Sequence, residues 1–162
     1  MVISKILLIF ALQIKKHMND NFFETVDMSE SSRSADSLFI GFICQIEGWK
    51  TKCKNLHWAA PKKNIHVYLD EFLTVLSDYQ DGLAEEEMGI LGKMAPNAIS
   101  GTPCDCLNAI DFITEVKNKT MEFYHNIPEE CEYAGIKSEC ETFIHNIFKY
   151  RYLFGLCDIR PY

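Results

Sequence analysis

The chain has 162 residues, of which 48% are hydrophobic, and this composition is enough to bury one sizeable core. The formal net charge of −7 argues against broad binding to a phosphate backbone, so DNA is not an expected partner. The seven cysteines are an odd number and no persuasive export signal precedes them, so we expect reduced thiols and a cytoplasmic location.

The N-terminal part begins with an apolar run over residues 2–14, interrupted by Lys5. A membrane-spanning helix needs about 20 apolar residues, so this run is too short and a membrane is not an expected partner. No small-x-small cleavage site follows it. We interpret the run as a docking helix, a buried first helix or an upstream extension. A polar, serine-rich stretch comes next, so residues 1–34 are predicted to be an N-terminal extension and linker.

Residues 35–158 are predicted to form one all-α domain. Apolar residues recur at intervals of three to four over four segments, which proline and glycine residues separate. The predicted helices span residues 35–59, 63–91, 103–126 and 129–156. Their lengths of about 36–43 Å suit an up-and-down four-helix bundle, in which about eleven residues cross one end between the second and third helices. The residues expected in the core include Leu107, Phe148 and Tyr152.

The third predicted helix begins at a cap formed by Thr102 and Pro103. Cys104 and Cys106 would then lie in its first turn. Two cysteines separated by one residue can bind a soft metal ion, although no second close pair accompanies them. Packing at the start of the helix is the alternative interpretation, and we favour it.

The most informative chemical pattern lies in the second predicted helix. His66 and Asp70 are four residues apart, and so are Asp81 and Glu85. At about 100° per residue, these four side chains fall within an arc of about 100° on one face. Imidazole and carboxylate groups at this spacing can hold one cation, and mixed nitrogen and oxygen ligands suit iron, manganese or zinc. An acid pair on a helix is usually solvated, but two such pairs on one stripe favour a metal site.

One copy of this helix cannot close the site, because His66 and Glu85 are about 28 Å apart along its axis. A second copy, packed antiparallel across a two-fold axis near Val75 and Leu76, would bring the two pairs together. We therefore expect a homodimer with two equivalent sites, each made by both subunits.

His57 is the fifth candidate ligand. Pro61 is predicted to end the preceding helix, and an antiparallel turn would place the His57 imidazole near His66. A lone histidine is more often exposed or hydrogen-bonded within the fold than a ligand. The interpretation of His57 therefore depends on the other four residues.

The stripe belongs to a longer pattern: H-W, then H-x-x-x-D, then ten residues, then D-x-x-x-E. It is carried by His57–Trp58, His66–Asp70 and Asp81–Glu85, and it continues to Leu91–Gly92. This pattern resembles the ferroxidase motif of Dps-type miniferritins, which belong to the ferritin-like superfamily. The resemblance implies a ferritin-like four-helix bundle that binds iron between two-fold-related subunits. In that family peroxide or dioxygen oxidises ferrous iron at this site, and a hollow dodecamer stores the mineral.

The resemblance assigns five ligands to two subunits: His57, His66 and Asp70 to one, and Asp81 and Glu85 to its mate. They are the expected catalytic and metal-binding residues. The expected cofactor is iron, as Fe²⁺ and Fe³⁺, and the same ligands also accept zinc or manganese. Trp58 would either intercept oxidising equivalents or serve in ordinary helix packing, and we favour packing.

The sequence departs from the family pattern in two places. The segment between His57 and His66 is shorter than usual for the family. The connection after Gly92 is too short to contain much of the short helix that the family packs at its dimer interface. We therefore expect two-fold pairing at least, whereas a larger shell stays open. The basic tail with which some relatives bind DNA is not evident.

Three alternatives follow from the same residues. Ferritin-like di-iron proteins hold metals inside one bundle with E-x-x-H motifs, and Glu122 with His125 has that spacing, beside a looser pair of Glu141 and His145. We favour surface positions for both pairs. The second alternative is a non-catalytic ferritin-like assembly protein that keeps the stripe for structural metal binding or subunit pairing. Protection of DNA is the third.

Overall fold

The computed structural model describes residues 30–158, with side chains over residues 35–157. The chain divides into two units, Met1–Glu30 and Ser31–Tyr162, and the packing described below lies within the second. The elements are α2 (Glu30–Ala59), α3 (Lys63–Leu91), α4 (Ala109–Asn126), the 3₁₀ turn η1 (Cys131–Tyr133) and α5 (Ala134–Asp158). No strand occurs between residues 30 and 158, so the prediction of an all-α four-helix bundle is confirmed. Helix α2 begins five residues before the predicted start at residue 35, and the extension up to residue 29 lies outside the described residues.

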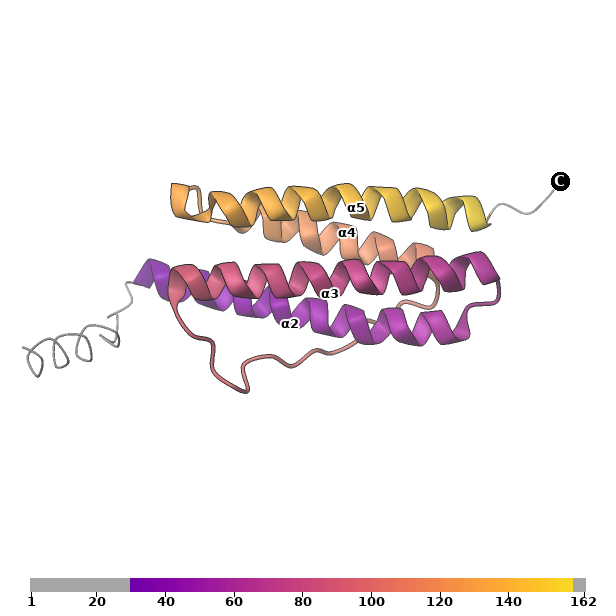
Figure 1. Cartoon of the computed structure of the whole chain (residues 1–162), viewed down its shortest axis with the longest axis horizontal. Coiled ribbons are helices and arrows are strands. Elements are labelled where there is room, and N and C mark those ends of the chain that lie inside the picture. The colour runs from indigo at the N-terminus through magenta and orange to yellow at the C-terminus, as the bar shows by residue number, and fades with distance from the viewer. Residues whose placement is uncertain (1–29, 159–162) are drawn as a thin grey trace, which may run out of the picture. The chain divides into compact units, whose positions relative to one another are not determined.

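The order of the helices differs from the up-and-down prediction. Helices α3 and α4 run in one direction, whereas α2 and α5 run in the other (Figure 1). The starts of α3 and α4 meet the end of α5, where Ile65, Ala109 and Phe154 line one pocket. The connection between α3 and α4 therefore has to return along the bundle. It comprises seventeen residues, 92–108, instead of the expected eleven, and this length makes the crossover possible.

The connection is longer than predicted because α4 begins late. The side-chain oxygen of Asn108 accepts a hydrogen bond from the Asp111 backbone N–H at 2.9 Å, which makes Asn108 the N-cap. An asparagine at this position satisfies one of the N–H groups that a helix start leaves unpaired. The predicted cap at Thr102 and Pro103 is therefore wrong, and Cys104 lies before the helix.

The crossover connection, residues 92–108, packs against two successive turns of α2. The Cys44 thiol donates to the Ala98 carbonyl oxygen at 3.5 Å and accepts from the Ser100 N–H at 3.5 Å. One turn later, Gly48 lies so close to the connection that a Cβ atom there would be 2.2 Å from the Thr102 carbonyl oxygen. Because only glycine leaves room for this contact, the fit of the connection on α2 depends on Gly48.

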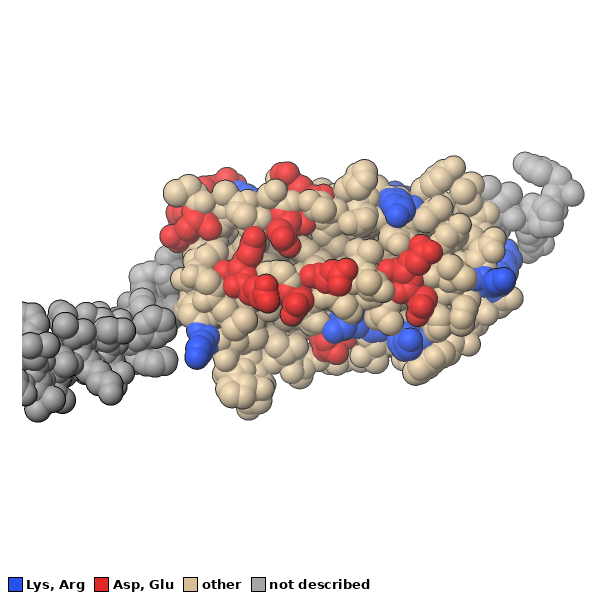
Figure 2. Space-filling view, viewed as in Figure 1, with Lys and Arg blue, Asp and Glu red and all other residues tan. Residues whose placement is uncertain are grey.

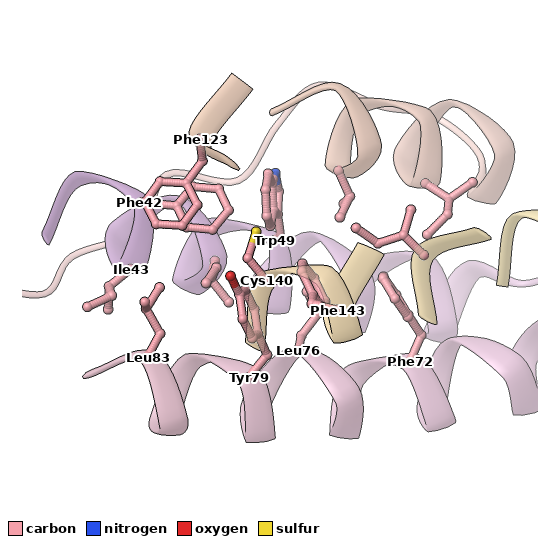
Figure 3. Packing of buried hydrophobic residues seen from close by; sticks show 14 of the residues in the cluster. Phe42, Ile43, Trp49, Phe72, Leu76, Tyr79, Leu83, Phe123, Cys140 and Phe143 are labelled. Atoms are coloured by element: carbon pink, nitrogen blue, oxygen red, sulfur yellow. The ribbon is translucent and has the colours of Figure 1, made fainter. Parts of the chain in front are cut away.

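Each helix faces its neighbours with an apolar stripe. Acidic side chains lie in a row over α3 on the face that Figure 2 shows. Inside the bundle, the Phe42 and Phe123 rings stack with centroids 3.8 Å apart and join α2 to α4 (Figure 3). The Tyr79 and Phe143 rings, 4.1 Å apart, join α3 to α5 in the same way. Aromatic stacking thus links both pairs of helices across the core.

Three of the expected core residues are exposed. Leu107 is 87% exposed, because it precedes α4 instead of lying within it. Phe148 and Tyr152 lie on the outer face of α5, and the prediction of burial is wrong for them too. The buried residues of α5 recur at three- and four-residue intervals along a stripe that excludes these two positions: Ile136, Cys140, Phe143, Ile147, Tyr150 and Phe154.

A carboxyl group interrupts the apolar stripe of α3. Glu87 is only 1% exposed, and its Oε2 atom has no hydrogen-bond partner among the described residues. The pKa of Glu87 is raised to about 7, mostly by burial and in addition by a hydrogen bond with Asp36 of α2 and by the charge of Asp36. Both effects favour the protonated carboxyl, since a charged group loses its hydration inside the protein.

We predict that Gly48→Ala destabilises the fold by about 1–3 kcal/mol, because the added methyl group would force the connection away from α2. Gly41→Ala is the matched control on the same helix, since a Cβ atom there meets nothing within 4 Å. Alanine at that exposed position should instead stabilise α2 by about 0.5–1 kcal/mol. Urea unfolding followed by circular dichroism measures both changes. Equal effects of the two substitutions would contradict the close contact at Gly48.

We also predict that Glu87→Gln stabilises the protein at pH 8 and not at pH 4. The pKa is about 7 in the folded chain against 4.5 for the free group. Between these values the folded state holds a proton that the unfolded state has lost, so stability falls as the pH rises. Glutamine removes this loss, with a gain at pH 8 of up to about 3 kcal/mol. Urea unfolding at both pH values tests this, with the exposed Glu85→Gln as control, and equal gains at the two pH values would refute it.

Candidate metal centre

The short turn between α2 and α3 brings the two predicted histidine ligands together. Helix α2 ends at Ala59, and α3 begins at Lys63 after Pro61. The imidazole rings of His57 and His66 stack across this turn, with centroids 3.8 Å apart and ring planes at 28°. The prediction that Pro61 ends the helix and places His57 near His66 is therefore confirmed.

Each histidine of this pair is held by the backbone of the other. The Nδ1 atom of His57 lies 3.0 Å from the His66 carbonyl oxygen, and the Nδ1 atom of His66 lies 3.0 Å from the His57 carbonyl oxygen. A carbonyl oxygen only accepts hydrogen bonds, so each Nδ1 atom carries the proton. In the neutral rings the lone pair is then on Nε2. Metal-binding histidines are commonly oriented in this way, with one ring nitrogen bonded to the protein and the other left for the metal.

Asp70 lies beside the histidine pair. Its Oδ1 atom is 3.8 Å from His57 Nδ1 and 3.8 Å from the Lys54 ammonium group. The same ammonium group lies 5.7 Å from the centre of the Trp58 ring. The carboxylate is largely exposed, so its attraction to Lys54 is weak and leaves Asp70 available to a stronger cation.

Trp58 differs from its sequence-based interpretation. We expected ordinary helix packing, but the side chain is 70% exposed in the single chain. It lies in the last turn of α2, beside Lys54. An exposed tryptophan carries a large apolar area, which a second protein surface can cover.

Asp81 and Glu85 lie on the exposed side of α3, farther along the helix than His66. At about 1.5 Å per residue, Glu85 is about 28 Å from His66 along the axis, so one chain does not bring them together. Among the described residues, no group of three or more histidine, cysteine, aspartate or glutamate side chains is arranged to hold a metal ion. The structure places His57, His66 and Asp70 near one another, but not in an arrangement that could hold a metal ion by itself, and the sharing of the site between subunits stays a prediction.

The surface near the expected two-fold axis consists of other residues than those named from the sequence. Leu76 is fully buried and Val75 is half-buried. The exposed side of α3 at this level carries Thr74 and, half-buried, Ser77. Their hydroxyl groups donate to carbonyl oxygens one turn earlier in α3, at 3.5 and 2.9 Å. Two small side chains whose hydroxyl groups are already paired thus lie at this level, next to the exposed Asp78.

A polar network fixes α2 against α3 beside this face. The Lys50 ammonium group donates to Glu47 at 3.0 Å and to the Gln80 side-chain oxygen at 2.8 Å. The Gln80 amide donates to Glu47 at 3.2 Å and to the Ile43 carbonyl oxygen at 3.1 Å. The hydrogen bond from Lys50 lowers the pKa of Glu47, and the bond from Gln80 adds to this effect against the opposing influence of burial. This network therefore helps to set the relative position of α2 and α3.

The charge of the α3 surface favours cations. Its exposed or half-buried carboxylates are Asp70, Glu71, Asp78, Asp81, Glu85 and Glu86. Burial raises the pKa of Glu86, and the nearby charge of Glu139 on α5 raises it further. Figure 2 shows acidic side chains gathered over α3. Such a field raises the local concentration of positive ions.

The alternative site inside one bundle lacks support in the geometry. Glu122 pairs with Lys119 at 2.9 Å on the surface of α4, and His125 is exposed. Glu141 and His145 are exposed on α5. These residues therefore lie on the outside of the helices, whereas an intramolecular di-iron site needs ligands that project into the bundle.

Sequence reasoning missed Lys54, which occupies the space next to Asp70. One signal could have found it, since Lys54 precedes His57 by three residues and so shares its helix face. The hydrogen bonds that orient the histidines could not be predicted, because they depend on the conformation of the turn. Comparisons of the chain with protein-family models, curated proteins and solved structures find no match. None of the helices between residues 30 and 158 is long and apolar enough to cross a membrane.

Proposed function

We propose that the chain is a ferroxidase that oxidises ferrous iron at sites shared by two subunits. The observation that carries this proposal is the stacked pair of His57 and His66. Their Nδ1 atoms are bonded to the backbone, which leaves both Nε2 atoms as candidate ligands, and the exposed Asp70 carboxylate lies 3.8 Å from the Nδ1 atom of His57. Two nitrogen ligands and one oxygen ligand from one subunit suit iron and leave positions for ligands from another.

The register of α3 supports a partner subunit as the source of those ligands. In an antiparallel pair of α3 helices, one alignment places His66 opposite Glu85 of the partner subunit and also Asp70 opposite Asp81 of the partner subunit. The same alignment places Thr74 opposite Ser77 of the partner subunit. Small residues at the axis let two helices approach closely. At each end of the pair, the ligands from the two subunits then come within reach of one ion.

The connectivity of the bundle supports a ferritin-like protein. A single long crossover between two parallel helices distinguishes ferritin-like bundles from simple up-and-down bundles. In this chain the crossover is the connection over residues 92–108. This connection runs against α2, so it leaves most of the α3 stripe free for a partner.

The proposed reaction is a two-electron transfer to a peroxide or to dioxygen. With hydrogen peroxide, two ferrous ions each lose one electron, and the peroxide takes up two protons and leaves as two water molecules. The proteins of this class contribute ligand geometry and an open coordination position for the oxidant. Here the carboxylates of Asp70, Asp81 and Glu85 would stabilise the ferric product, because hard oxygen ligands favour the higher charge.

A second candidate is a non-catalytic assembly protein of the same fold. The observation that favours it is the connection over residues 92–108, which contains no helix. The family packs a short helix from this connection at the dimer interface, so its lack removes part of the expected contact. In this case the stripe would serve subunit pairing, and bound metal would be structural.

We predict that two inactive variants restore activity when they form hybrid dimers. Asp70→Ala and Asp81→Ala should each lower the rate of ferrous iron oxidation at least tenfold. A hybrid dimer contains one site with both defects and one intact site. Random mixing makes about half of the dimers hybrid, so about a quarter of the wild-type sites should return. Stopped-flow absorbance of ferric iron measures the rate after the two chains are refolded together.

A matched pair of variants controls for this result. Asp70→Ala and His66→Ala affect the same half of the site, so their hybrid dimers contain no intact site and should remain inactive. Recovery by this second pair, or no recovery by the first, would contradict ligation across the subunit boundary. Wild-type dimers that bind metal but do not oxidise ferrous iron would favour the assembly protein.

We further predict that a redox-inert cation strengthens the dimer. Each shared site would collect three carboxylates, Asp70 of one subunit with Asp81 and Glu85 of the other, and these repel one another without a cation. Zn²⁺ should lower the dimer dissociation constant at least tenfold relative to protein in EDTA, as measured by sedimentation velocity. Asp81→Asn should reduce this dependence, whereas Glu71→Gln, on another face of α3, should not. A dissociation constant that is the same in Zn²⁺ and in EDTA would argue against the shared site.

A further inference from the structure

A second group of metal-binding atoms lies in the crossover connection. The sulfur atoms of Cys104 and Cys106 are 3.5 Å apart, and both residues are half-buried against the core. They lie between the Gly48 contact with the connection and the start of α4 at Ala109. The histidine pair lies at the α2–α3 turn and contains no sulfur, so the two groups are chemically separate.

The backbone that carries the two cysteines is held in place before any ligand binds. A Cβ atom on Gly101 would lie 2.2 Å from the Gly48 backbone nitrogen, so the connection and α2 touch backbone to backbone. After the cysteines, the Asn108 cap fixes the chain at the start of α4. A site supported on both sides loses little conformational freedom when it binds, which favours affinity.

The distance between the sulfur atoms suits a shared metal ion better than a disulfide. With metal–sulfur bonds of about 2.3 Å and near-tetrahedral angles, two thiolates on one ion lie about 3.8 Å apart. The observed separation of 3.5 Å differs from this by a few tenths of an ångström. A disulfide requires about 2.05 Å, so the two sulfur atoms would have to approach by about 1.5 Å.

The surroundings of the pair also disfavour oxidation. The pKa of Cys106 is raised to about 11, mostly by burial and in addition by the hydrogen bond with Cys104 and the charges of Cys104 and Glu115, against a lowering by Lys52. Lys52 comes from α2 and Glu115 from α4, the two helices beside the connection. A thiol that keeps its proton at neutral pH is a poor nucleophile for disulfide formation. A metal ion with high affinity for sulfur can still displace the proton.

We propose that Cys104 and Cys106 together bind one thiophilic metal ion, of the class of Zn²⁺ or Cu⁺, in the crossover connection. For a divalent ion, two sulfur–metal bonds form and the two thiols release two protons, so the ion and its ligands are neutral together. No third histidine, cysteine or acidic ligand is arranged around the pair within residues 35–157. Water or a small anion fills the remaining positions, and the ion exchanges more readily than in a closed four-ligand site.

Cadmium is the probe for this site, because its bonds to thiolates give an ultraviolet charge-transfer band that histidine and carboxylate ligands do not produce. The reduced full-length chain is titrated with Cd²⁺, and proton release is followed in weakly buffered solution. We expect one thiolate-bound ion and two released protons per chain. Cys104→Ser and Cys106→Ser should each weaken this binding at least 100-fold. Cys131→Ser, which changes an exposed cysteine of η1, should leave it unchanged.

A second measurement covers the case in which a serine variant fails to fold. In the wild-type chain, one equivalent of Cd²⁺ should protect Cys104 and Cys106 from alkylation, as read for each peptide by mass spectrometry. The proposal is overturned if the serine variants bind Cd²⁺ as tightly as the wild type, or if Cd²⁺ protects only other cysteines. Either outcome leaves the proposed ferroxidase site untouched, because that site contains no cysteine.

Discussion

The arrangement of the bundle depends on one constraint: α3 and α4 run in the same direction, so the chain between them must return along the bundle. Helix α2 receives this segment through Cys44 and Gly48, on successive turns. The contact at Gly48 involves backbone atoms on both sides, so it tolerates no side chain. Because α2 takes the connection on one side and α3 on another, the outward face of α3 keeps its polar stripe exposed. The candidate metal centre and the cysteine pair both depend on this division of surfaces.

The histidine pair rests on a different kind of interaction, which is local. Its two reciprocal hydrogen bonds join the last turn of α2 to the first turn of α3, across only a few intervening residues. Both hydrogen bonds are made within the turn region itself, so they hold the two rings in place locally. The carboxylates of α3 are placed by helix periodicity alone.

Sequence reasoning located most of the helices and failed where the chain leaves regular structure. Helix α3 was predicted with its observed bounds, because Pro61 and Gly92 mark its two ends. The start of α4 was placed six residues too early, because Thr102 and Pro103 resemble a cap, whereas Asn108 performs that role. Because of this error the predicted connection was too short, and the helices were wrongly expected to alternate up and down. The turn at Pro61 predicted the proximity of His57 to His66. The exposure of Trp58 was not predicted, because periodicity alone does not show whether a neighbouring helix covers a residue in the last turn of α2.

The exposure of Trp58 has a practical consequence. The chain contains two tryptophans, and they occupy opposite environments: Trp49 is fully buried in the core, whereas Trp58 is 70% exposed beside Lys54. Indole fluorescence shifts to longer wavelengths in water and is quenched by dissolved collisional agents only where these can reach the ring. The protein therefore carries two intrinsic optical reporters. Emission from Trp49 follows unfolding of the interior, and emission from Trp58 follows events at the histidine turn, so the two can be separated by quenching without attaching a dye.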